Sequence, residues 1–86
     1  MLIQTKYDIG QRIWIMYKHQ GEVQAYCEPI LEIVFEKDRY FYATEHSYDE
    51  IAEKDIILED DKDKLFEKIQ KLMKEIDEEE AKENGE

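Results

Sequence analysis

The fold class is decided by the stretch Arg12-Ile13-Trp14-Ile15-Met16-Tyr17-Lys18. Its side chains alternate between two faces, and this period of two with β-branched and aromatic residues predicts a strand. The same kind of pattern predicts strands at residues 22–27, 30–36 and 39–44, and a short fifth strand at residues 55–59. Residues 19–22 and 37–38 are expected to form hairpin connections between them.

The periodicity changes to that of a helix after residue 60. Either Asp60 or Asp61 is expected to cap this helix. Its apolar stripe consists of Leu65, Phe66, Ile69, Leu72, Met73 and Ile76. The pairs Glu67–Lys71 and Lys74–Glu78 stand at i, i+4 and are expected to support it. The sequence therefore predicts an α+β fold: a small antiparallel β-sheet or SH3-like barrel of about five strands with one C-terminal amphipathic helix.

The 86 residues are sufficient for one domain. We expect a single α+β domain over residues 1–76 and an acidic tail over residues 77–86. The tail is expected to fray, because apolar support for the helix ends at Ile76. Within the helix, residues 65, 69, 72 and 76 follow the spacing of a coiled-coil seam, which leaves a homodimer possible. Packing of this stripe on the sheet of the same chain is the favoured interpretation.

The chain is strongly acidic, with 23 acidic and 12 basic residues and a net charge of −11. This charge repels nucleic-acid phosphates and anionic lipids, so we expect neither direct nucleic-acid binding nor membrane binding. The charge is uneven: residues 59–74 sum to zero, whereas residues 75–86 carry 7 acidic residues and 1 basic residue. The excess acid either keeps the protein soluble or selects a partner with a basic surface.

A basic partner would meet the ordered acidic residues between positions 45 and 63. These candidates for an acidic binding face are Glu45, Asp49, Glu50, Glu53, Asp55, Glu59, Asp60, Asp61 and Asp63. Aromatic residues on the strands form a second candidate surface, because one helix covers only one face of a sheet and Tyr and Trp are common hot spots. These candidates are Trp14, Tyr26, Tyr40 and Tyr42. A place in the core is the alternative for each of them.

Catalytic and metal-binding motifs are missing, so we expect a protein that is not an enzyme and needs no cofactor or metal. The three glycines are not spaced as in a phosphate-binding loop. The motif Glu45-His46-x-x-Asp49 resembles a set of metal ligands, but a polar loop is the favoured interpretation. The single cysteine, Cys27, fits a reducing compartment. With no signal peptide or long apolar run, the expected location is the cytoplasm of a bacterium or a phage-infected host.

The order of predicted elements resembles that of small uncharacterised proteins from phages and mobile elements of Gram-positive bacteria. The resemblance rests on Lys6-Tyr7-Asp8-Ile9-Gly10-Gln11-Arg12-Ile13-Trp14-Ile15, and on residues 51–58 followed by an Asp-capped helix. It implies an SH3-like or similar small twisted β-sheet and no established activity. Phage genomes also encode small acidic inhibitors of host defence, including anti-CRISPR proteins, which are similar to this chain in size and charge.

These observations lead to an expected function. We expect a non-enzymatic protein of a phage or mobile element that inhibits a host protein by covering its basic surface. A nucleic-acid-handling effector such as a CRISPR nuclease is the expected kind of host protein. The alternative is a homo-oligomeric structural or adaptor module, assembled through the C-terminal helix or an open sheet edge.

Overall fold

A computed structural model describes residues 5–47 and 49–85 of the chain. Its elements are, in chain order, β1 (Arg12–His19), β2 (Glu22–Pro29), β3 (Glu32–Glu36), β4 (Arg39–Ala43), β5 (Ile51–Ala52), the 3₁₀ helix η1 (Glu53–Asp55) and α1 (Lys62–Gly85). The expected α+β class, with small antiparallel sheets and a C-terminal helix, is confirmed. The strands form two sheets instead of one, in the orders β1-β2 and β3-β4-β5.

Two tight turns set the register of the hairpins. Gln20 and Gly21 join β1 to β2 with φ angles of 52° and 76°, and Lys37 and Asp38 join β3 to β4 with φ angles of 52° and 63°. Positive φ at both central residues is the condition for a type I′ turn, whose twist matches that of the paired strands. Both predicted connections are therefore confirmed, the second without a glycine.

The prediction of a fifth strand at residues 55–59 is wrong. The strand that completes the second sheet is β5, whose Ile51 pairs with Tyr42. Residues 57–59 instead run beside β1, where Ile13 and Leu58 form an isolated bridge. The backbone N–H of Trp14 donates to the Ile57 carbonyl at 2.8 Å. The backbone N–H of Glu59 likewise donates to the Arg12 carbonyl at 3.1 Å, so this segment pairs with β1 at a single bridge and forms no strand of its own.

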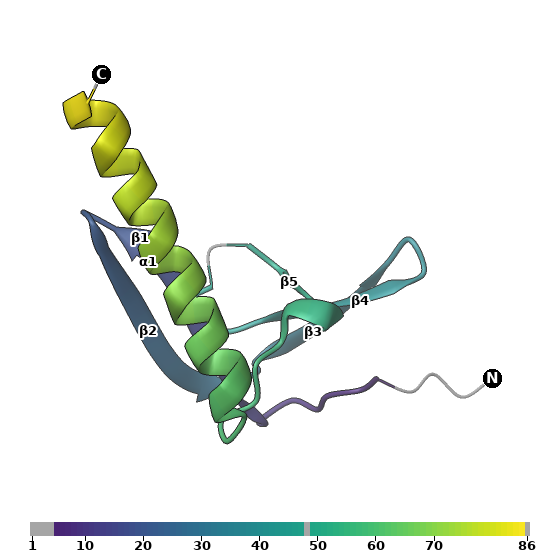
Figure 1. Cartoon of the computed structure of the whole chain (residues 1–86). Coiled ribbons are helices and arrows are strands. Elements are labelled where there is room, and N and C mark those ends of the chain that lie inside the picture. Colours follow the sequence, from purple (N-terminus) through teal and green to yellow (C-terminus); the bar gives the residue numbers. More distant parts are fainter. Residues whose placement is uncertain (1–4, 48, 86) are drawn as a thin grey trace.

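The core lies between the β1–β2 hairpin and the β3-β4-β5 sheet. It is built around the buried residues Tyr7, Ile13, Ile15, Ile30, Tyr42 and Ile56. Figure 1 shows α1 lying along the β1–β2 hairpin, whereas the β3–β4 hairpin points away from the helix. The molecule is accordingly elongated, measuring 56 × 28 × 21 Å.

The helix is capped as predicted but is longer than predicted. Asp61 Oδ1 accepts the backbone N–H of Lys64 at 3.2 Å, so Asp61 is the residue that caps α1. The expected fraying from residue 77 is not what the structure shows, because α1 continues to Gly85; Glu86 lies outside the described residues. Glutamate predominates in this extension, and it is a good helix former. Lys18 of β1 also forms ion pairs with Glu75 and Glu79, which attaches this end of α1 to the hairpin.

Candidate functional site

The nine acidic residues predicted to form one face are divided among several places. Figure 1 shows residues 45–47 and 49–50 well apart from the turn of residues 59–61 that precedes α1. Glu59 is paired with Arg12 at 3.1 Å between Oε2 and Nε. Glu53 accepts a hydrogen bond from the Tyr42 hydroxyl at 2.7 Å. Glu45, Asp49, Glu50, Asp60, Asp61 and Asp63 are exposed. Asp55 is also exposed and lines a lysine-rich groove between η1 and α1.

The four aromatic candidates have different surroundings. Trp14 is half-buried, and its Nε1 donates to the Glu59 carbonyl at 3.0 Å. Tyr26 is half-buried and stacks on the His46 ring with centroids 4.3 Å apart. Tyr40 is half-buried beside Phe35. The expectation that Tyr42 is partly exposed is wrong: its exposed fraction is 0%.

Tyr42 is a core residue because its position on β4 faces the other sheet. Its ring meets Tyr7 edge-on, with centroids 5.5 Å apart. Its hydroxyl finds a partner in Glu53, so the polar end of the side chain is satisfied without contact with water. Tyr42 therefore stabilises the core and is not part of a binding surface.

The structure brings together a Glu–His pair that the sequence separates by 18 positions. The Nδ1 of His46 lies 2.7 Å from Oε1 of Glu28, and the backbone N–H of His46 donates to Oε2 of Glu28 at 2.7 Å. This pairing occupies the histidine of the motif Glu45-His46-x-x-Asp49. Among the described residues, no three His, Cys, Asp or Glu side chains come together as a metal site would require. The pair thus attaches the turn that follows β4 to Glu28 of β2.

Glu28 should make the protein less stable as the pH falls into the acid range. Burial favours its neutral form, but the neighbouring Thr44 and the contacts with His46 outweigh burial and hold the pKa of Glu28 below its ordinary value. A carboxyl whose pKa is lowered by folding stabilises the protein above its unfolded pKa, and this contribution disappears as the pH falls through the folded pKa. We expect Glu28→Gln to be destabilised at pH 7 and to lose less stability than the wild type between about pH 5 and 3. Urea unfolding across this pH range measures the free energy of unfolding of each protein, with the exposed substitution Glu32→Gln as the control. Parallel curves of stability against pH for the wild type and Glu28→Gln would contradict the prediction.

Cys27 lacks the lowered pKa of an activated thiol, although the Arg12 guanidinium acts in that direction. Burial is the largest cause that raises its pKa, and the Glu59 carboxylate, with Oε2 3.4 Å from the Cys27 sulfur, raises it further. A nucleophilic cysteine needs a lowered pKa, because the thiolate is the reactive form. The surroundings of Cys27 therefore favour the inert thiol.

A shallow groove lies between the β1–β2 turn and α1, and we call it the acidic groove. It has a volume of about 290 Å³ and is lined by Gly21, Glu22, Val23, Met73, Ile76, Asp77 and Glu80. Its apolar part includes Met73, which is 55% exposed, and its polar part consists of three carboxylates. Sequence reasoning missed this groove because Glu22 lies more than fifty positions from Asp77. The sequence also counted Met73 among the residues of the apolar stripe, whereas the structure leaves it exposed.

Comparison with protein-family models, with curated proteins and with solved structures finds no match to this chain. In the described part of the chain, no helix combines the length and the apolar character that a membrane crossing requires.

Proposed function

We propose that this protein is a non-catalytic binding protein whose partner presents a basic, partly apolar surface to the acidic groove. The observation that carries this proposal is the composition of the groove. Val23 and Met73 provide apolar surface, and the carboxylates of Glu22, Asp77 and Glu80 stand around it. A lysine or arginine side chain fits such a site, because its apolar stem can cover the floor while its charged end meets the carboxylates.

The position of the acidic residues on α1 supports a role in binding. Five of the six residues from 75 to 80 are acidic. Like charges three or four positions apart on a helix, such as Asp77 and Glu80, repel each other, so this arrangement lowers the stability of the isolated helix. The chain tolerates that cost in the segment that lies beside the tip of the β1–β2 hairpin, where Asp77 and Glu80 line the acidic groove. A cationic partner would neutralise the charge and remove the cost.

The proposed groove lies elsewhere than the acidic face between residues 45 and 63. The remaining exposed carboxylates of that face add to the net charge of −11, which attracts a basic partner from a distance. The finer proposal is an inhibitor from a phage or mobile element that covers the basic surface of a nucleic-acid-handling host effector. Small size and strong negative charge support it.

The alternative of a homo-oligomer joined through the helix has less support. Leu65, Leu72 and Ile76 of the proposed seam are buried within the single chain. This stripe packs against the β1–β2 hairpin and is not available to a second copy. The exposed apolar residues that remain on α1 are Phe66 and Met73, and Met73 belongs to the acidic groove.

Removing the charge of the groove should weaken binding of a cationic partner at least tenfold. The variant is Glu22→Gln/Asp77→Asn/Glu80→Gln, and the probe is a synthetic amphipathic peptide of lysine and leucine residues at helical spacing. The matched control, Glu32→Gln/Glu36→Gln/Asp38→Asn, changes the net charge equally at exposed positions on the β3–β4 hairpin. Calorimetric titration at two salt concentrations measures the affinities, and circular dichroism verifies that both variants keep α1.

The control separates a binding site from a general effect of charge. Equal weakening by the two triple variants would mean that net charge alone attracts the peptide, and the proposed site would be rejected. Unchanged affinity in the groove variant would place any binding surface elsewhere. A specific loss that also diminishes at high salt, where attraction is screened, is the result that supports the proposal.

A further inference from the structure

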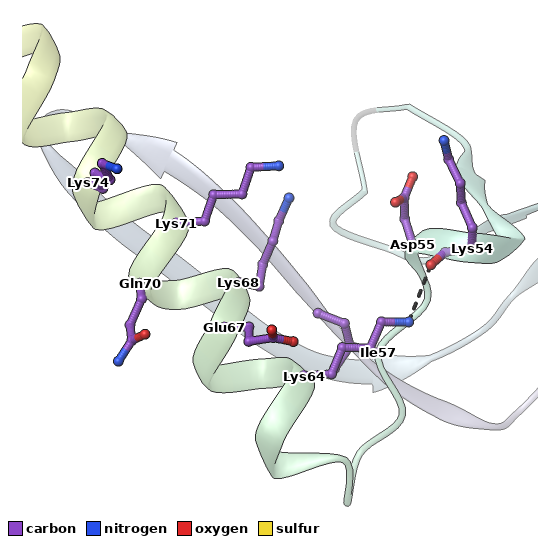
Figure 2. A pocket seen from close by; sticks show the side chains of 9 residues that line it. All are labelled: Lys54, Asp55, Ile57, Lys64, Glu67, Lys68, Gln70, Lys71 and Lys74. Atoms are coloured by element: carbon purple, nitrogen blue, oxygen red, sulfur yellow. Dashed lines mark hydrogen bonds between the residues drawn. The ribbon is translucent and has the colours of Figure 1, made fainter.

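Lysines gather on one flank of α1, in a chain that is otherwise strongly acidic. They line a groove of about 610 Å³ between α1 and η1, which we call the lysine groove. Its lining residues are Lys54, Asp55, Ile57, Lys64, Glu67, Lys68, Gln70, Lys71 and Lys74. Figure 2 shows Lys68 and Lys71 pointing from the helix toward the side of the groove where Lys54 stands. Five ammonium groups thus face two carboxylates in one open depression.

Most of these ammonium groups lack a carboxylate partner. Within the described residues, Lys54, Lys68, Lys71 and Lys74 form no salt bridge within 4.0 Å. The i, i+4 pairs that the sequence predicts, Glu67–Lys71 and Lys74–Glu78, are therefore not formed. Isolated lysines are common on surfaces, but four that converge in a chain with 23 acidic residues need a separate explanation.

One lysine fixes the geometry of the groove. Lys64 Nζ donates to the Ile56 carbonyl at 2.7 Å and to the Lys54 carbonyl at 3.3 Å. Figure 2 marks the second of these contacts, which joins α1 to η1 across the floor. The two walls of the groove are thereby held together, and Lys54 on one wall stays opposite Lys68 and Lys71 on the other.

We infer that the lysine groove binds a small anion with several phosphoryl groups. Lysine presents a compact point charge with three donors, which suits the tetrahedral oxygens of phosphate, whereas planar carboxylates are best held by the fork of arginine. No arginine lines the groove. The groove has the size of a small-molecule site. The Cα atoms of Lys68 and Lys74 are separated by about 9 Å along the helix axis, so a chain of phosphoryl groups can meet more than one ammonium group.

The groove recognises the phosphate chain itself and no attached ring. Among the described residues that line it, none is aromatic and Ile57 alone is aliphatic. A nucleoside triphosphate and inorganic triphosphate should therefore bind with similar affinity. This site is independent of the acidic groove, because Lys71 and Met73 are separated by about 200° around the helix and so face opposite flanks.

Titration with inorganic triphosphate in metal-free buffer tests the inference. We expect saturable binding, with amide NMR shifts concentrated at residues that line the groove. Lys68→Gln/Lys71→Gln should weaken binding at least tenfold. The control Lys62→Gln/Lys37→Asn, which removes the same charge at exposed positions outside the groove, should change the affinity less than twofold. Amide spectra of both variants establish that they are folded.

Three outcomes would overturn the inference. Equal weakening by the groove and control variants would show that the anion only responds to overall charge. Citrate binding as tightly as triphosphate would show a general anion site or a site for a carboxylate-rich segment, such as the acidic end of a second copy. Adenosine triphosphate binding tenfold more tightly than inorganic triphosphate would show that the groove recognises more than phosphate.

Discussion

An Ile30→Ala variant is expected to lose about 2–5 kcal/mol of its free energy of unfolding, a large share of what a domain of this size possesses. Ile30 has an exposed fraction of 0% and lies in the chain between β2 and β3, where the two sheets meet. Its backbone is fixed on both sides: Gly10 N–H donates to the Ile30 carbonyl at 2.8 Å, and Ile30 N–H donates to the Gln11 carbonyl at 3.0 Å. Truncation would leave a cavity that these fixed backbones cannot close.

The adjacent residue offers a matched control. Leu31 is 57% exposed, so Leu31→Ala removes a similar apolar group from the surface and should change stability by no more than about 0.5 kcal/mol. Urea unfolding followed by circular dichroism gives both free energies. A similar loss in the two variants would mean that Ile30 does not join the sheets in the way described.

The local elements were predictable because their signals are local. Alternation in residues 12–18 and the turn residues around Gly21 and Asp38 determine two hairpins without help from distant residues. The division into two sheets was not predictable, because it depends on where the chain leaves one sheet for another. Pro29 cannot donate to a ladder, and β2 ends there. The expected strand at residues 55–59 fails because residues 53–55 form η1 and Leu58 meets β1 at an isolated bridge only, and no periodicity reveals either.

The candidate sites were less predictable than the fold. A sum of charges conceals their positions: residues 59–74 are neutral in total, yet Lys64, Lys68 and Lys71 share one flank of α1 and line one groove. Their 4-3 spacing was the same signal that identified the apolar stripe, and it could have identified this flank. No sequence pattern could have brought Lys54 or Glu22 to their grooves, since only tertiary packing does so.

Tyr42 should make the protein unstable at alkaline pH. Burial is the largest cause that raises the pKa of Tyr42 to about 12, and the nearby Glu53 carboxylate adds to it. The ordinary pKa is about 10, so the unfolded chain releases this proton first. The contribution of the Tyr42 hydroxyl to the free energy of unfolding is therefore fully present below about pH 10. It is lost as the pH rises toward 12, and the loss is on the order of 2 kcal/mol.

Tyr42→Phe should remove this alkaline loss, because phenylalanine has no proton to release. The variant should also be less stable at pH 7 by about 1–2 kcal/mol, since the hydrogen bond to Glu53 disappears. Tyr40→Phe removes a phenol from a half-buried position on the same strand and should keep the alkaline slope of the wild type. Urea unfolding between pH 8 and pH 11.5 compares the three proteins. If the dependence of stability on pH in Tyr42→Phe equals that of the wild type, the alkaline loss belongs to other groups. The packing of the two sheets would then not depend on a protonated Tyr42 hydroxyl.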